Sequence, residues 1–296
     1  MKKTNAKLVN YNKYGWFFIS FALAAFCVFT IYPAVYSIWL SFQTFDAGEF
    51  HFSGLDNIKR MLGDKVFLKS LKNTFFFVVI QIPIMKVLAL YLSTLLNKTK
   101  LKGKGFFRTC TFLPCVTSLV AYSVLFKMMF SQSGIVNQAL MNLGVLDEPF
   151  QWLQDAGWAR GIIIVALTWR WTGYDVIFFL AAMANIPAET YEAAQIDGAG
   201  GWNIFWKITL PQLKPIILLT MIMSTNGTLQ LFDEPMNITA GGPMNATLTM
   251  SQYIYNQSFV YSPNLGYAAT LSYVIVFIMI ILAIIQFKVT GGDETQ

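Results

Sequence analysis

The sequence predicts an all-α, polytopic membrane protein with six transmembrane helices. Charged residues make up only 12% of the 296 residues, whereas soluble domains carry about 25%. Hydrophobic residues make up 55% and the mean hydropathy is +0.52, so much of the surface must face something other than water. Six segments are long and apolar enough to cross a bilayer, which takes about 20 helical residues. Because lipid offers no hydrogen-bond partners, we expect each of these segments to be an α-helix.

The six expected spans follow one another without an internal repeat or a low-complexity tract. The first apolar run is far longer than the core of a secretory signal, so we interpret it as a retained span. The length of the chain suits one transmembrane domain at 1–296. The spans are predicted at 15–40, 71–96, 106–130, 161–186, 215–232 and 266–287, with a five-helix core at 71–287 and tails at 1–14 and 288–296.

Lysine and arginine residues predict the orientation of the spans, because cytoplasmic loops are enriched in them. The N-terminus and the 97–105 loop each carry four lysines and no acid. The 131–160 loop has three acids against one base, and the 233–265 loop has two acids and no base. We therefore expect both termini and the 187–214 loop to be cytoplasmic. The 43–70 loop is mixed in charge, and its length and position indicate a partly folded external cap.

The 187–214 loop is predicted to form two short helices around a glycine hinge. Pro187 suits the first turn of a helix, where its missing N–H costs nothing. Gly198 has the conformational freedom to end that helix and turn the chain. A short helix of this kind can dock in a groove of a partner protein. The alternative is a hairpin that lies on the lipid surface, which Trp202 and Trp206 would suit.

The same loop contains a pattern that indicates a family. It matches E-A-A-x(3)-G-x(9)-I-x-L-P at every specified position, from Glu192 to Pro211. The chain thereby resembles the membrane-spanning subunit of bacterial binding-protein-dependent ABC importers. The resemblance implies that the loop docks into a cleft on a separate ATP-hydrolysing subunit. By resemblance, the residues that couple the chain to this ATPase are Glu192, Ala193, Ala194, Asp197, Gly198, Ile208, Leu210 and Pro211.

The resemblance also implies a set of partners. This chain has no G-x(4)-G-K-[ST] phosphate loop, so we expect it to be no enzyme and to bind no cofactor itself. ATP and Mg are expected to bind to a partner ATPase, and two ATPase subunits or domains are expected in the complex. A second permease would supply the other half of the pathway, and an extracellular solute-binding protein would deliver the solute. The expected location is the bacterial plasma (inner) membrane, and no nucleic-acid partner is expected.

Two further motifs resemble permeases for carbohydrates. A T-x-G-G-P segment at 239–243 is followed by a stretch rich in Tyr and Phe and by G-x-A-A at 266–269. This order resembles the maltose-type group of carbohydrate permeases and implies an oligosaccharide as the solute. The segment at 54–57, with Asn-Thr at 73–74, resembles the first of the two permeases in such systems. A permease for glycerol phosphate or another small polar solute is the alternative.

The fifth span has an unusually polar middle. Neutral hydroxyl and amide groups suit a ligand rich in hydroxyls, because they avoid the desolvation cost of a charge. Ser224 and Thr228 share one helix face, and Asn226 and Gln230 share another; the resemblance places the first pair at sugar-contacting positions. Interhelical hydrogen bonding is the alternative for span five, and packing or interfacial anchoring for the aromatic residues of span four. The predicted substrate-pathway residues are Ser224, Asn226, Thr228, Gln230, Trp171, Tyr174 and Asp175.

An ion-driven transporter would need coupling charges within the membrane, and the candidates in the predicted spans are Lys86, Lys127, Arg170 and Asp175. Lys127 and Arg170 can reach an interface by snorkelling, whereas Lys86 and Asp175 are placed to pair inside the bundle. The near absence of paired intramembrane charges argues against an ion-coupled secondary transporter, which is the second candidate class. A glycerol phosphate permease would need cationic side chains in its cavity, and Lys86 and Arg170 are the candidates.

An intramembrane enzyme is the third candidate class, and the sequence contains few residues or motifs that would support catalysis. His51 is the one histidine, and it lies in a predicted external loop. Neither H-E-x-x-H nor G-x-S-x-G occurs, and the three cysteines lack the spacing of a metal site.

Overall fold

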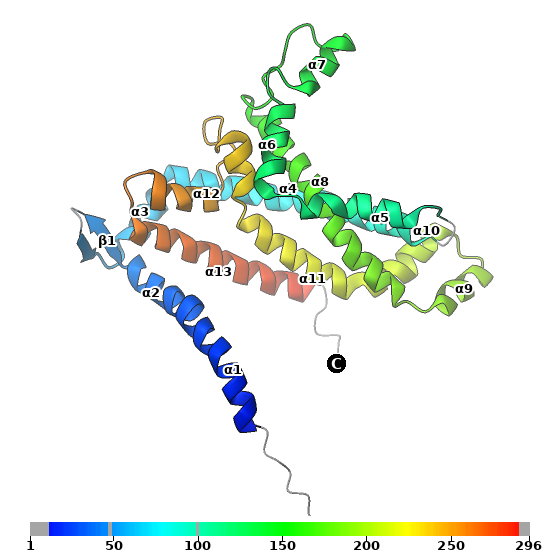
Figure 1. Ribbon diagram of the computed structural model, residues 1–296, viewed down its shortest axis with the longest axis horizontal. Coiled ribbons are helices and arrows are strands. Elements are labelled where there is room, and N and C mark those ends of the chain that lie inside the picture. Colours follow the sequence, from blue (N-terminus) through cyan, green and yellow to red (C-terminus); the bar gives the residue numbers. More distant parts are fainter. Residues whose placement is uncertain (1–11, 47–48, 99–100, 290–296) are drawn as a thin grey trace, which may run out of the picture.

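The computed structural model describes residues 12–46, 49–98 and 101–289, which are mainly helical (Figure 1). The predicted all-α class is confirmed, with one two-stranded sheet as the exception. The outer parts of both predicted tails, residues 1–11 and 290–296, lie outside the described residues. So do four of the lysines that the orientation argument uses: Lys2, Lys3, Lys7 and Lys100.

The first span leads away from the other helices (Figure 1). It forms one apolar stretch of 27 residues from Gly15 to Ser41, and no residue in its most apolar part is buried. Its main contact is with α13 (Leu265–Val289), where the Tyr273 hydroxyl donates a 2.5 Å hydrogen bond to the Ala34 carbonyl oxygen. Its elements are α1 (Asn12–Phe26), a π-helical turn (Cys27–Ile31) and α2 (Tyr32–Ser41).

The segment after this span folds into the small cap that the 43–70 loop predicts. Two antiparallel strands pair from Gln43 with Phe52 to Asp46 with Glu49. The buried Asn57 amide donates to the carbonyl oxygens of Ser41 at 2.9 Å and Gln43 at 2.8 Å, and so fixes the cap to the end of α2. The cap consists of β1 (Gln43–Asp46), β2 (Glu49–Phe52) and α3 (Asp56–Gly63).

Two long helices, α4 and α8, form the centre of the bundle and pack extensively on each other. Fully buried Phe77 and Ile163 belong to one core cluster between them, and Phe179 to another. The helix α11 packs against both of them, and α13 packs against α11. Their bounds are Lys65–Asn97 for α4, Ala156–Ala184 for α8, Leu210–Leu229 for α11 and Leu265–Val289 for α13.

The segment predicted as a single span at 106–130 is two helices that meet at an angle of 97°. Pro114 lacks an N–H, Thr117 has an extended backbone, and Ser118 caps the helix that follows. Apolar composition does not reveal such a break. The described residues therefore contain five helices able to cross a membrane, or six if this pair is one span. The elements are α5 (Lys104–Phe112), a 3₁₀ turn (Leu113–Val116) and α6 (Leu119–Met129).

The fifth span begins well before the predicted 215–232 and ends at Leu229. One helical stretch of 29 residues runs from Gly201 to Leu229, although it contains Pro211 and Pro215. A π-helical turn precedes the prolines, and the backbone stays helical through it. The predicted second arm of the loop is thus continuous with the span. The elements are α10 (Gly201–Ile204), the π-helical turn (Phe205–Thr209) and α11.

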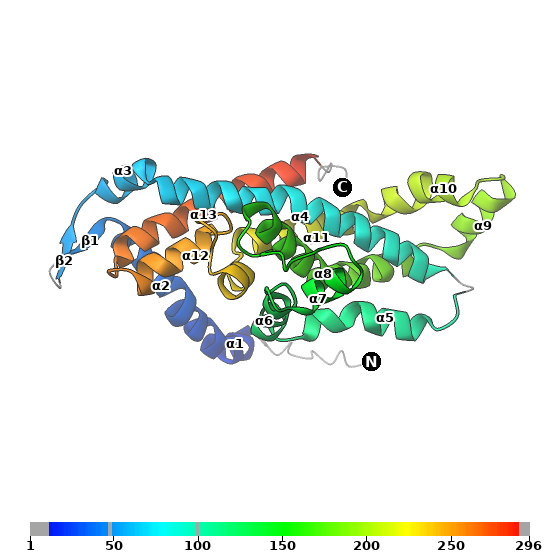
Figure 2. The ribbon, with the colours of Figure 1, turned by 90° about the horizontal axis from the view of Figure 1, so that it is seen from above.

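The remaining short elements connect the spans. Figure 2 shows α9 and α10 at one end of the molecule's long axis and α3, β1 and β2 at the opposite end. The loop between α8 and α11 and the cap thus lie at opposite ends of the spans. These short elements are α7 (Ile135–Asn142), α9 (Ala188–Ile196), a π-helical turn (Pro235–Thr239), α12 (Met250–Tyr255) and a second π-helical turn (Asn256–Val260).

Candidate functional site

A cavity of about 350 Å³ lies against α4, α8 and α11. This volume falls within the range of roughly 300–1,000 Å³ that is usual for small-molecule sites. Its walls combine hydroxyl, amide and aromatic groups with apolar side chains. Six of the seven predicted substrate-pathway residues line it: Trp171, Tyr174, Asp175, Ser224, Thr228 and Gln230.

The helical period explains which polar residues of α11 face the cavity. Ser224 and Thr228 are one turn apart and both line it. Asn226 lies about 200° around the helix from Ser224 and is not among the lining residues. Gln230, the residue that follows the end of α11 at Leu229, also lines the cavity. The Ser224 face of α11 thus lines the cavity with both of its predicted residues, and the Asn226 face contributes Gln230 alone.

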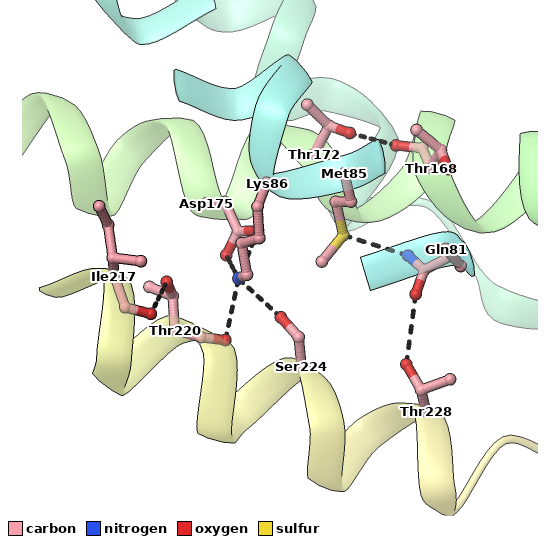
Figure 3. Close-up of polar contacts among 10 residues, drawn as sticks. All are labelled: Gln81, Met85, Lys86, Thr168, Thr172, Asp175, Ile217, Thr220, Ser224 and Thr228. Atoms are coloured by element: carbon pink, nitrogen blue, oxygen red, sulfur yellow. Dashed lines mark hydrogen bonds and ion pairs between the residues drawn. The ribbon is translucent and has the colours of Figure 1, made fainter. Parts of the chain in front are cut away.

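Some residues of the cavity wall are not predicted from the sequence. Gln81 of α4 is buried, and its Oε1 accepts a 3.3 Å hydrogen bond from the Thr228 hydroxyl (Figure 3). An amide isolated in the apolar run of span two is the signal that would have pointed to it. Further lining residues come from the segment that follows α11: Leu231, Phe232, Asp233 and Glu234.

Lys86 and Asp175 form an ion pair beside the cavity, as their positions predict. The Lys86 ammonium donates to Asp175 Oδ1 at 2.8 Å and Oδ2 at 2.7 Å (Figure 3). It also reaches the Thr220 carbonyl oxygen at 2.9 Å and the Ser224 hydroxyl at 2.8 Å. Lys86 is 5% exposed and Asp175 2%. One ammonium therefore joins α4, α8 and α11 at the cavity wall.

The snorkelling expected of Arg170 is wrong. Its side chain is 5% exposed, and its Nη1 donates to the carbonyl oxygens of Pro114 at 3.0 Å and Thr117 at 2.6 Å. The guanidinium also lies over the rings of Tyr122 and Trp171. The bend between α5 and α6 exposes backbone carbonyls, and these attract the arginine inward. Arg170 thus holds the bend against α8 instead of reaching an interface.

The predicted coupling loop is an exposed hairpin. Its first arm is α9, and Gly198 turns the chain with a φ of +79°, which glycine adopts without strain. Tyr191 and Thr209 join the two arms through their hydroxyls at 3.3 Å. Ile196 at its tip is 86% exposed. Within the described part of the chain, neither Glu192 nor Asp197 forms an ion pair.

The predicted coupling residues follow one another along this hairpin, from its first arm through its turn to its second arm. Five of them, Glu192, Ala193, Asp197, Gly198 and Pro211, are exposed, and Ala194, Ile208 and Leu210 are half-buried. These residues therefore present a polar edge and small side chains outward, beside the exposed Ile196, Trp202 and Trp206 of the same hairpin.

The chain is similar in sequence to permease proteins of sugar transport systems. The chain is 52% identical over 279 residues to the lactose transport system permease protein of Rhizobium radiobacter, covering 94% of both chains. It is 34% identical to the arabinooligosaccharides transport system permease protein of Halalkalibacterium halodurans, covering 93% of this chain and 88% of the relative.

A solved structure has the same fold. A chain of a bacterial ABC transporter involved in the import of the acidic polysaccharide alginate superposes with a TM-score of 0.83 at 23% identity, covering 96% of this chain and 98% of that one. The family model for the binding-protein-dependent transport system inner membrane component matches residues 67–291. The chain therefore belongs to this family of inner membrane transport components and is a multi-pass membrane protein.

Proposed function

We propose that this chain forms half of the translocation pathway of an ATP-driven importer for a carbohydrate. A disaccharide or a short oligosaccharide is the best substrate with which to test this function. The cavity against α4, α8 and α11 carries the proposal. Its hydroxyl and amide groups, from Ser224, Thr228 and Gln81, exchange hydrogen bonds with a sugar and need no charge. Relatives named for lactose and arabinooligosaccharide transport support a sugar as the solute.

Aromatic residues complete a sugar-binding wall. Trp171 and Tyr174 line the cavity with their ring centroids 6.3 Å apart and their planes at 88°. The two rings thus present surfaces in different directions. An apolar ring face suits the C–H surface of a pyranose, while the hydroxyls around the sugar's rim reach the polar groups of α11.

The driving energy is proposed to come from a separate ATPase. The hairpin that contains Glu192 and Gly198 is exposed. Its first arm, α9, is a short helix of the kind that docks in a groove of a partner protein. The 29-residue helix from Gly201 to Leu229 leads from this hairpin to Ser224 and Thr228 at the cavity. A displacement of the docked hairpin would therefore move the cavity wall directly. ATP and Mg would be bound by the ATPase and not by this chain.

The other partners follow from the family. A second permease would provide the opposite wall of the pathway, and an external solute-binding protein would deliver the sugar. The same scheme places both termini and the hairpin in the cytoplasm of a bacterium and the cap at 43–70 outside. The exposed face of the first span is available to lipid or to the second permease.

Reconstitution tests the proposal. The chain, the second permease and the ATPase encoded with it are placed in vesicles with the binding protein outside, and uptake of radiolabelled lactose is followed. The expected result is uptake that requires internal ATP and every subunit, and that an ionophore leaves unchanged. Uptake by this chain alone, driven by an ion gradient without ATP, would support a secondary transporter instead.

A further inference from the structure

The cavity wall contains carboxylates but no available cation. Among its lining residues in the described part of the chain, Asp175, Asp233 and Glu234 are acidic, and none is lysine or arginine. The nearest bases of α4 and α8 are Lys86 and Arg170. Arg170 is buried and is not among the lining residues, and its Nη1 donates to the backbone carbonyls at the bend between α5 and α6.

Lys86 is fully engaged by the protein. An ammonium has three N–H donors, and Lys86 has four acceptors between 2.7 and 2.9 Å: two oxygens of Asp175, the Thr220 carbonyl and the Ser224 hydroxyl. It has no N–H left for a solute. Its positive charge is offset by the Asp175 carboxylate, so the pair adds no net charge to the wall.

The same arrangement sets the direction of a hydrogen bond at Ser224. The Ser224 oxygen accepts from Lys86, so its own O–H is left to donate. That O–H meets no acceptor within the described residues, and Ser224 lines the cavity. A solute there meets a donor that a sugar hydroxyl or ring oxygen satisfies, and it meets no cation that would compensate a carboxylate or a phosphate.

We propose that the Lys86–Asp175 pair is a selectivity element of the transport pathway, which admits uncharged sugars and excludes sugars that carry a carboxylate or a phosphate. The inference rests on the proposed function and narrows its substrate class. An anion that enters this cavity loses water without gaining a counter-charge, and it also faces Asp233 and Glu234. A neutral sugar incurs neither cost.

The two partners of the pair allow opposite changes in charge. Asp175→Asn keeps the shape of the side chain but leaves the Lys86 ammonium without its counter-charge at the wall. Lys86→Gln removes the cation and leaves the carboxylate. The double variant K86Q/D175N removes both charges. A role in packing alone predicts that these variants slow every sugar in parallel, whereas a role in selectivity predicts that only D175N favours the anion.

The test compares lactose with lactose whose galactose carbon 6 is oxidised to a carboxylate. Each is taken up by vesicles that contain the complete transporter, at concentrations that saturate the binding protein, with that saturation measured separately by equilibrium dialysis. The wild type is expected to transport lactose and to discriminate strongly against the uronate. The uronate-to-lactose rate ratio is expected to rise about tenfold or more in D175N. The reason is that the Lys86 ammonium, without its counter-charge, attracts the carboxylate of the uronate strongly at a separation of a few ångströms. It is expected not to rise in K86Q or in K86Q/D175N.

Controls separate the inference from the proposed function. Asp56→Asn opens the exposed Asp56–Lys59 pair and should leave the ratio unchanged. If D175N does not assemble with its partners, Thr228→Lys introduces a free cation in the same cavity and should raise the ratio. A wild type that takes up neither sugar with ATP would overturn the proposed function. A wild type that transports lactose, with a ratio that is equal in all variants, would overturn the selectivity inference alone.

Discussion

The Tyr267 hydroxyl donates a 2.6 Å hydrogen bond to Asp64 Oδ2, and so joins the start of α13 to the start of α4. The Tyr253 hydroxyl of α12 donates to the same oxygen at 2.5 Å. Asp64 Oδ1 in turn caps α4, accepting from the backbone N–H groups of Val66 and Phe67. One carboxylate thus organises three helices at the end of the molecule that carries the cap.

Acid should weaken this junction. Burial by itself raises the pKa of Asp64, but hydrogen bonds from Tyr253, Tyr267 and two backbone N–H groups outweigh it, and the pKa is lowered overall. A carboxylate whose pKa is lower in the folded state stabilises that state fully above about pH 4, its ordinary pKa range. The contribution is lost as the pH falls through the lowered pKa. The apparent melting temperature in detergent should therefore fall below pH 4 by more in the wild type than in Asp64→Asn.

Asp64→Asn itself should lower the stability at neutral pH by about 2 kcal/mol, the usual worth of hydrogen bonds to a charged group. Thermal unfolding in detergent at pH 7 measures this change. Asp56→Asn, in the same cap but at an exposed position, is the matched control and should change the melting temperature little. Equal effects of the two substitutions would show that the junction contributes nothing specific.

Gly173 should not tolerate a methyl group. A Cβ at this position of α8 would lie 2.0 Å from the Thr111 carbonyl oxygen of α5, which is backbone and cannot move aside cheaply. Gly173→Ala should therefore lower the stability by about 1–3 kcal/mol or prevent assembly. Gly161→Ala in the same helix has no atom within 4 Å of its Cβ, so alanine there should be neutral or stabilising. The yield and melting temperature of the two variants test the close approach of α5 and α8.

The turn of the coupling hairpin should depend on Gly198. Its φ of +79° is strained for alanine, although a Cβ meets no neighbour there. Gly198→Ala should therefore leave the fold of the spans intact but reduce transport and the ATPase activity that the binding protein stimulates. Gly201→Ala, a nearby glycine with ordinary φ and open surroundings, is the control. Full transport by G198A would show that the shape of this turn is not needed for coupling.

The two faces of α11 should differ in transport. Thr228→Val keeps the volume of the side chain but removes the hydroxyl that lines the cavity, and it should raise the KM for lactose uptake about five- to tenfold, the worth of one hydrogen bond. Asn226→Ala, on the other face, should leave KM within about twofold of the wild type. The opposite order of effects would place the pathway on the face of Asn226.

Local composition predicts the helices of this chain well, because an apolar run in lipid has no other way to pair its backbone. It does not predict the bend at 113–118 or the continuation of α11 back to Gly201, since both depend on how individual turns accommodate proline. The interior pairing of Lys86 with Asp175 follows from the cost of an isolated charge. The burial of Arg170 does not, because its partners are carbonyls that only the bend exposes.

The cavity, too, has features that the sequence predicts and features that depend on tertiary packing. Helical periodicity separates Ser224 and Thr228 from Asn226, but the choice between the two faces is made by the packing of α11 on α4 and α8. Gln81 belongs to a different span, and its place beside Thr228 depends on how the two helices align. Distances between spans are tertiary information that one sequence does not contain.

Crosslinking from Ala194 tests most directly whether the hairpin binds the ATPase. In a chain whose three cysteines are replaced by serine, Ala194→Cys is treated with a bifunctional reagent in the assembled transporter. We expect capture of the ATPase subunit in a yield that changes with ATP, while Met244→Cys, 85% exposed beyond the other end of α11, captures none. Failure to capture an ATPase, or labelling of residue 194 in intact cells by an impermeant thiol reagent, would contradict the account.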